Sequence, residues 1–228
     1  MKWFIDFLTS SIGRKLVMSL TGLFLCSFLI IHVTGNSLLF FNDGGLLFNA
    51  FTAWMEGNII IRTIEYLLFA AFIIHILQSI LITYKNNQAR SKGYAVSNAN
   101  ANSKWYSRWM GVLGTLIFVF LVIHLKDFFW ELRFGDEDFG TDAWGNVNLF
   151  REVKATFEMP AYAALYFFSM IPLAYHLMHG FQSGFRTLGI MHKKYTPLIE
   201  TVGTWFFGIL IPLLFALMPV YFQIKKMM

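Results

Sequence analysis

The sequence predicts an all-α integral membrane protein whose five membrane-spanning helices form a single domain over residues 1–228. Hydrophobic residues make up 57% of the chain and charged residues only 14%, which is too apolar for a soluble domain of this size. A helix needs about 20 mostly apolar residues to cross a hydrocarbon core. Five runs meet that length: residues 16–41, 59–84, 109–130, 160–185 and 198–221.

The spans differ in what joins them. The first is no cleaved signal peptide, because its apolar run is too long and no small-residue cleavage site follows it. Residues 85–107 are polar, basic and rich in Asn and Ser, which predicts a flexible loop. Residues 126–159 form either a solvated loop or a lid, and VNLFREVKATF near their end has the spacing of a short amphipathic helix at the membrane surface. The fifth span has no histidine and carries Pro212 and Pro219, so we expect it outside a bundle of the first four.

Basic side chains collect on one side of the expected membrane, and acidic side chains collect in the longest loop on the other side. The basic residues are Lys2, Arg14, Lys15, Lys85, Arg90, Lys92, Lys104, Arg108, Arg186, Lys193 and Lys194. The acidic residues are Asp136, Glu137, Asp138 and Asp142. Cytoplasmic loops carry an excess of Lys and Arg, so the N-terminus is expected in the cytoplasm, although Lys225 and Lys226 disagree. The net charge of +5 therefore indicates a bilayer, and no nucleic acid, as the partner.

Each of the first four spans carries a candidate histidine, namely His32, His75, His124 and His176, and the fourth also carries His179. An ionisable side chain inside a bilayer is costly and is a candidate for function. His32 and His124 follow the nearest basic residue by 17 and 16 positions, which places both roughly 25 Å from that boundary. His75 and His176 each precede a basic residue by ten positions and lie at about 15 Å. The depths predict two facing pairs, His32 with His124 and His75 with His176.

Two imidazoles at equal depth can fill both axial positions of a haem iron, so the first four spans are expected to form a di-haem bundle with these histidines as metal ligands. Small residues one turn after the second and fourth histidines, Ser79 and Gly180, leave room for a macrocycle. Zinc is disfavoured because no site offers three or four clustered ligands. The lack of a Cys-x-x-Cys-His motif excludes a c-type haem. Two alternatives stay open: the histidines form interhelical hydrogen bonds, or His179 replaces His176, which is preferred for its depth.

The first and third spans resemble each other when they are aligned on their histidines. SLTGLFLCSFLIIH and GVLGTLIFVFLVIH share a glycine ten residues before the histidine, Gly22 and Gly114, and a phenylalanine four residues before it, Phe28 and Phe120. The second and fourth spans share a histidine followed four residues later by a small residue. Such a repeat suits a pseudo-twofold four-helix bundle around flat cofactors.

Three stretches resemble the cytochrome b membrane anchor of succinate dehydrogenase and fumarate reductase: SSIGRKLVMSLTGLFL, H-x-x-G-N from His32, and H-x-x-x-G-F-x-S-G-F-R-T-L-G-I from His176. The resemblance covers essentially the whole chain and is closest to the five-helix, single-chain, di-haem, b558-like type. It implies two haem b groups, with axial pairs His32/His124 and His75/His176, in a bacterial cytoplasmic membrane. It also implies a flavoprotein subunit, an iron–sulfur subunit docked on the basic loops, and menaquinone as the exchangeable substrate. The anchor itself would perform no succinate or fumarate chemistry.

The sequence departs from the family's pattern at two places. Members studied for transmembrane proton transfer carry a Glu two residues before the fourth histidine, where this chain has Ala174. The family's quinol site near the outer haem uses an acidic residue, for which Asp43, Glu56 and Glu65 are candidates. Glu65 is favoured because it lies within the second span, either as a buried proton acceptor or as a membrane-edge side chain reaching water.

Two other functions remain as alternatives. One is the cytochrome b anchor of a hydrogenase or formate dehydrogenase. The other is a haem-free transporter whose histidines relay protons. A visible spectrum separates the second from any cytochrome, because a transporter shows no sharp α-band on reduction.

Overall fold

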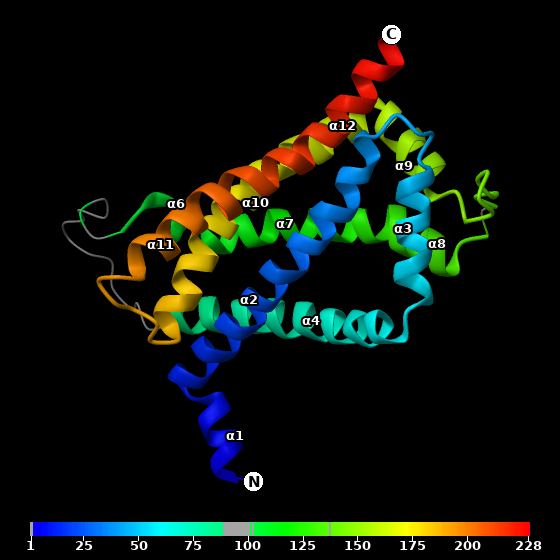
Figure 1. The fold of residues 1–228 in the computed structure, drawn as a ribbon. Helices are drawn as coiled ribbons and strands as arrows, with labels where there is room; N and C mark the ends of the chain where they lie inside the picture. The colour runs from blue at the N-terminus through cyan, green and yellow to red at the C-terminus, as the bar shows by residue number, and fades with distance from the viewer. Residues whose placement is uncertain (1, 89–100, 102, 137) are drawn as a thin grey trace.

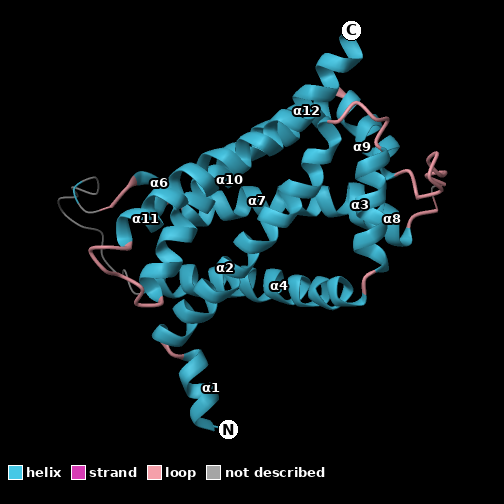
Figure 2. Ribbon diagram, in the orientation of Figure 1, coloured by secondary structure: helices cyan, strands magenta, loops and turns pink. Residues whose placement is uncertain are grey.

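The computed structural model describes residues 2–88, 101, 103–136 and 138–228. Three charged residues of the expected loops, Arg90, Lys92 and Glu137, lie outside these ranges. Within the described residues the regular structure is helical, apart from an isolated antiparallel bridge between Thr141 and Val147 (Figure 2). The all-α class expected from the sequence is confirmed.

Five helices of the described chain are long and apolar enough to cross a membrane, and each begins and ends within six residues of an expected span. The first span runs over α2 (Ser11–Asn36) and η1 (Ser37–Phe40), and the second is α4 (Ile59–Gln88). The third runs over α7 (Met110–His124), η2 (Leu125–Trp130) and α8 (Glu131–Phe134), and the fourth is α10 (Pro160–Thr187). The fifth runs over α11 (Thr196–Thr201), η3 (Val202–Leu210) and α12 (Ile211–Met227). Both η2 and η3 are π-helical turns. The length and composition of these helices are those of a multi-pass membrane protein.

Shorter helices lie at the ends of the spans (Figure 1). α1 (Lys2–Thr9) leads into α2, and α6 (Trp105–Arg108) leads into α7. α3 (Leu46–Gly57) and α9 (Leu149–Glu158) lie together with α8 at the opposite end from α6 and α11. We call the end with α3, α8 and α9 the acidic-loop end, and the end with α6 and α11 the basic-loop end.

Polar side chains set where the helices begin. Ser10 Oγ accepts a hydrogen bond from a first-turn N–H of α2 at 3.0 Å, and Asn58 Oδ1 does the same for α4 at 2.9 Å. The carboxylate of Asp43 accepts hydrogen bonds from the N–H groups of Gly45 and Leu47 at the start of α3, both at 2.9 Å. These acceptors satisfy N–H groups that the first turn of a helix leaves unpaired.

A buried amide holds the acidic-loop end together. Asn49 of α3 is completely buried. Its Nδ2 donates to Asp142 Oδ2 and to Asn148 Oδ1, both at 3.2 Å, and its Oδ1 accepts from the N–H of Phe150 at 2.9 Å. The long connection and the first turn of α9 are therefore tied to α3, because a buried amide left unpaired would be destabilising.

The amphipathic helix expected near residue 150 is present as α9. It buries Val153, Thr156 and Phe157 on one side and exposes Arg151 and Lys154 on the other. The buried side packs toward the ends of the spans, which places α9 as a cover over the acidic-loop end of the bundle.

The fifth span packs along α10 and also reaches the histidine helices (Figure 1). The ring of Phe207 stacks on Phe181 of α10 with centroids 4.4 Å apart, and the ring of Phe215 lies 5.6 Å from that of His32. The span lies beside the first four, against α10 and α2, while Phe215 and Met218 reach the wall of the cavity. Its prolines do not prevent it from supplying bulky side chains to the interior.

The two lysines that disagree with the charge distribution lie at the acidic-loop end. Lys225 Nζ donates to Asn42 Oδ1 at 2.9 Å, and Lys226 Nζ donates to the carbonyl oxygen of Glu158 at 3.0 Å. Each ammonium group thus has a nearby acceptor, which gives the two charges a structural role at the end of α12.

Gly45 offers a test of how closely α9 packs on the start of α3. Its φ is +87°, and a Cβ at this position would overlap the ring of Phe150. Gly45→Ala should lower the free energy of unfolding by about 2 kcal/mol or more, through backbone strain and overlap together. Gly44→Ala is the matched control, since its φ is +70° but a Cβ there has no atom within 4 Å. Denaturant unfolding in detergent measures both, and equal losses would contradict the overlap with Phe150.

Candidate functional site

The four span histidines meet in two pairs inside the bundle. The ring centroids of His32 of α2 and His124 of α7 lie 5.8 Å apart, and those of His75 of α4 and His176 of α10 lie 6.3 Å apart. These are the two pairs expected from the helix depths. Each pair joins alternate spans, so the contacts arise from the packing of the bundle and not from a local motif.

A cavity of about 2380 Å³ is lined by all four of these histidines. Pockets for single small ligands usually measure about 300–1,000 Å³. This cavity therefore has room for more than one large ligand. Lys15 and Arg108 line it toward the basic-loop end, Glu56, Glu65 and Arg133 line it toward the acidic-loop end, and the wall between is mainly aliphatic and aromatic.

The long connection before α10 does not line this cavity. In the described part of residues 135–148 no side chain contributes to the wall, whereas Leu149, Val153 and Phe157 of α9 do. For residues 126–159 the sequence left open a solvated loop or a lid, and each interpretation describes one part: the described residues between 135 and 148 do not line the cavity, whereas α9 covers its acidic-loop end.

The internal repeat has a structural counterpart around the histidines. A Cβ on Gly22 would lie 3.2 Å from Cε1 of His75, and a Cβ on Gly114 would lie 3.8 Å from Cε1 of His176. The two aligned glycines thus take equivalent places, each beside the histidine of the next span. A Cβ on Gly180 would have no atom within 4 Å, and Gly180 lines the cavity. Small residues therefore leave open space where the sequence predicted it.

The two phenylalanines of the repeat also correspond. The ring of Phe28 stacks on His32 with centroids 5.1 Å apart, and the ring of Phe120 stacks on His124 at 5.7 Å. Each phenylalanine lies one helical turn before its histidine, on the same face of the helix. The stacked rings restrict how far the two imidazoles can turn.

A hydroxyl group orients one of the imidazoles. Thr21 Oγ1 lies 3.1 Å from Nδ1 of His75 and donates its own hydrogen to the carbonyl oxygen of Val17 at 2.8 Å. The hydroxyl oxygen is then free to accept a hydrogen bond from His75 Nδ1–H. This arrangement assigns the ring proton to Nδ1 and leaves the lone pair on Nε2, as a metal-binding imidazole requires.

Among the residues that the structure describes, none on a neighbouring helix forms a hydrogen bond with Nδ1 of the other three histidines. His32 Nδ1 lies 3.4 Å from Asn36 Nδ2, which is on the same helix. Within the described residues, Nδ1 of His124 and Nδ1 of His176 are buried without a hydrogen-bond partner. Interhelical hydrogen bonding therefore accounts for His75 but not for the remaining histidines.

The spacing of both pairs fits shared coordination of a metal ion. An imidazole nitrogen binds a metal at about 2 Å, so two imidazoles on opposite sides of one ion have ring centres about 6 Å apart. The observed separations are 5.8 and 6.3 Å. Two imidazoles leave the other coordination positions to a non-protein ligand, which the porphyrin of a haem supplies. The described residues hold no cluster of three or more His, Cys, Asp or Glu side chains around one point.

His179 lies apart from the second pair. Its ring is 6.1 Å from that of Tyr106, whereas the ring facing His75 is that of His176. His179 lines the cavity on the side of α6, and His192 is exposed in the loop after α10. The geometry therefore supports the preference for His176 over His179.

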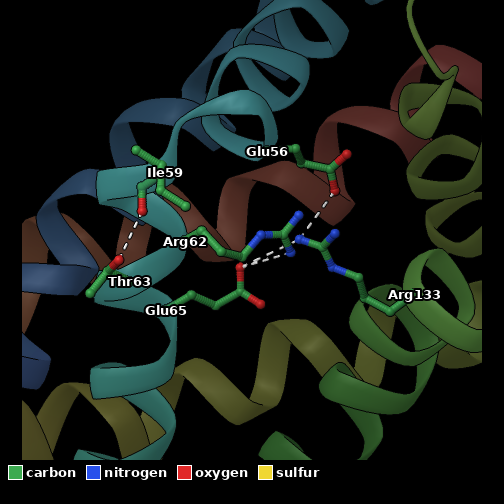
Figure 3. Close-up of polar contacts among 6 residues, drawn as sticks. All are labelled: Glu56, Ile59, Arg62, Thr63, Glu65 and Arg133. Atoms are coloured by element: carbon green, nitrogen blue, oxygen red, sulfur yellow. Dashed lines mark hydrogen bonds and ion pairs between the residues drawn. The ribbon is translucent and has the colours of Figure 1, made fainter.

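Figure 3 shows a charged cluster formed by side chains of α3, α4 and α8, and Glu56, Glu65 and Arg133 of this cluster line the cavity. Arg133 of α8 lies between Glu65 of α4 and Glu56 of α3, with N–O distances of 3.4 and 3.6 Å, and Arg62 lies 3.6 Å from Glu65. The side chains are between 22% and 32% exposed, so the cluster lies between water and the cavity. Asp43, the third acidic candidate, caps α3 and does not line the cavity.

Sequence reasoning missed a buried carboxylate beside the site. Asp127 in η2 is buried and accepts a hydrogen bond from the hydroxyl of Tyr166 at 3.3 Å. The sequence prediction places Asp127 where the expected third span, residues 109–130, overlaps the expected connection of residues 126–159, and gives it no role, whereas the span continues to Phe134. The available signal was the period of the apolar residues, since Phe128, Phe129 and Trp130 continue the run past Asp127.

A comparison of the chain with protein-family models, with curated proteins and with solved structures finds no match.

Proposed function

We propose that this chain is a di-haem cytochrome b that anchors a succinate:menaquinone oxidoreductase in a bacterial cytoplasmic membrane. It would relay electrons between the iron–sulfur subunit of that complex and menaquinone. The observation that carries the proposal is the meeting of four histidines from four spans in two pairs along one cavity. A bound haem supplies a one-electron carrier at each pair, while the protein supplies ligands, packing and electrostatics.

The residues around the pairs have separate tasks in this proposal. Thr21 fixes the tautomer of His75, and the stacked Phe28 and Phe120 restrain the other pair. The aliphatic and aromatic wall excludes water from the path between the two pairs, which limits the solvent rearrangement that accompanies a change of charge. The open space at Gly180 leaves a place for the plane of a cofactor.

The ends of the cavity support a direction for the electron path. The basic-loop end carries Arg108, Arg186, Lys193 and Lys194, which suits the cytoplasmic side and a soluble partner there. The acidic-loop end lies nearer His32 and His124 in sequence depth. Menaquinone would therefore exchange electrons with the His32/His124 pair, near the cluster of Glu65, Glu56 and Arg133.

The complex to which the anchor belongs can be tested with substrates. The resemblance in SSIGRKLVMSLTGLFL and in the motif from His176 favours succinate or fumarate as the partner reaction. Succinate added to membranes containing the complex should reduce the haem, as followed by its visible bands. Reduction by hydrogen or formate instead of succinate would identify the alternative anchors, and the absence of any haem band would favour the proton transporter.

The first prediction from this function concerns stoichiometry. Two b-type haems should bind per chain, because the four histidines define two bis-histidine sites about 6 Å across. A pyridine haemochrome assay on the purified chain, with protein measured by amino-acid analysis, gives the ratio. One haem per chain, or none, would contradict the proposal.

The second prediction separates the two neighbouring histidines of α10. His176→Ala should remove the haem at the His75 pair and halve the haem content, because the iron loses one axial ligand. His179→Ala is the matched control on the same helix and should retain both haems. The opposite result, with haem lost only from His179→Ala, would show that the ligand assignment in α10 is wrong.

A further inference from the structure

A buried carboxylate in the third span connects the protein surface to the cavity. Asp127 lies in the π-helical turn η2, and its side chain is only 6% exposed. A buried acidic residue within a membrane span is costly and therefore a candidate for function. π-Helical turns are also frequent at functional sites. Asp127 has no task in the electron path described above.

The two oxygen atoms of Asp127 have partners in opposite directions. Oδ1 lies 3.6 Å from Nζ of Lys126, whose side chain is 64% exposed. Oδ2 accepts a hydrogen bond from the hydroxyl of Tyr166 at 3.3 Å. Tyr166 is buried and lines the cavity, whereas Asp127 does not. The carboxylate therefore stands between an aqueous surface and a cavity-lining hydroxyl.

The surroundings of Tyr166 are otherwise aromatic. Its ring lies 5.0 Å from that of Phe120, 5.1 Å from Phe157 and 6.0 Å from both Phe128 and His124. The phenylalanine rings exclude water from this part of the wall, and the hydroxyl of Tyr166 donates its hydrogen bond to Asp127. The Tyr166–Asp127 hydrogen bond therefore offers a proton a route across the wall.

We propose that Tyr166 and Asp127 pass protons between the cavity and water at the acidic-loop end. In the direction of release, a proton donor in the cavity gives its proton to the Tyr166 oxygen while the hydroxyl hydrogen passes to Asp127 Oδ2. Asp127 then releases that proton to water on the side of Lys126. Only protons move, Tyr166 ends each step neutral, and uptake follows the same steps in reverse.

This inference rests on the proposed function, which supplies the proton donor. A quinol that gives two electrons to the cytochrome must also release two protons. Both protons have to cross the apolar wall of the cavity to reach water. The titratable groups near Asp127 or near its hydrogen-bond partner are Lys126 on its own turn, His124 on α7, Glu131 on α8, and Tyr162 and Tyr166 on α10. Of these, Tyr166 is the group hydrogen-bonded to the carboxylate, and its place in the wall makes it the contact with the cavity.

The test uses the whole complex in lipid nanodiscs, mixed rapidly with a water-soluble naphthoquinol. Haem reduction is followed in the visible bands, and proton release is followed with a pH-indicator dye, in light and heavy water. The variants are Asp127→Asn and Tyr166→Phe, each of which keeps the shape of the side chain. Tyr162→Phe is the matched control, because it removes a hydroxyl one turn earlier on the same helix.

Asp127→Asn and Tyr166→Phe should slow quinol-driven haem reduction and proton release by about tenfold or more, as expected for loss of a positioned proton acceptor. Their dithionite-reduced spectra and haem content should match the unaltered complex, and Tyr162→Phe should retain its rates. Added formate, a small diffusible proton carrier, should restore the rate of Asp127→Asn.

Three results would overturn the proposal in distinguishable ways. Unaltered rates in Asp127→Asn with normal haem bands would remove Asp127 from the proton path and leave the proposed function intact. Slowed rates that formate does not restore would assign the pair a structural role. Absence of haem bands from the unaltered complex would overturn the proposed function, and this inference with it.

Discussion

The interior of a bilayer offers no partner to an imidazole, and the rest of this structure follows from that constraint. The transfer of an unpaired polar group from water to hydrocarbon costs about 4–8 kcal/mol of free energy. Four spans of this chain nevertheless carry a histidine, and the bundle brings them together in pairs. The glycines beside the rings, the stacked phenylalanines and the hydroxyl of Thr21 all serve that pairing. The fold is therefore best understood as a frame that holds polar rings at two positions along an apolar cavity.

Much of this arrangement could be predicted because it depends on periodic, one-dimensional properties of the sequence. Apolar length fixes the number of spans, and the rise of a helix converts residue number into depth, which is why His32 and His124 could be matched before any contact was known. The repeat around Gly22 and Gly114 likewise predicted equivalent surroundings. Each glycine precedes the histidine of its own span by the same number of residues, so the two glycines occupy equivalent positions on their helices.

What escaped prediction depends on how helices continue and pack. The third span continues to Phe134, past its expected end at Trp130, and η2 carries the helix through the charged Lys126 and Asp127. Hydropathy also carries no information on which face of the fifth span turns inward, so the contact of Phe215 with His32 was not foreseen. The ion pairs of Arg133 join three separate elements, and no spacing within one segment encodes such a contact.

The second span stands out for how little of it is enclosed by protein. Only 6% of the most apolar stretch of α4 is buried within the described structure, against 44% for the fifth span. α4 packs mainly along α2, another of its sides faces the cavity, and much of the remainder faces outward. Whatever fills the cavity is then a structural component of the chain, since a ligand that binds only the folded form stabilises it. Without a filler α4 packs mainly on α2, so we expect it to be the span that opens most readily and exposes the chain to quality-control proteases.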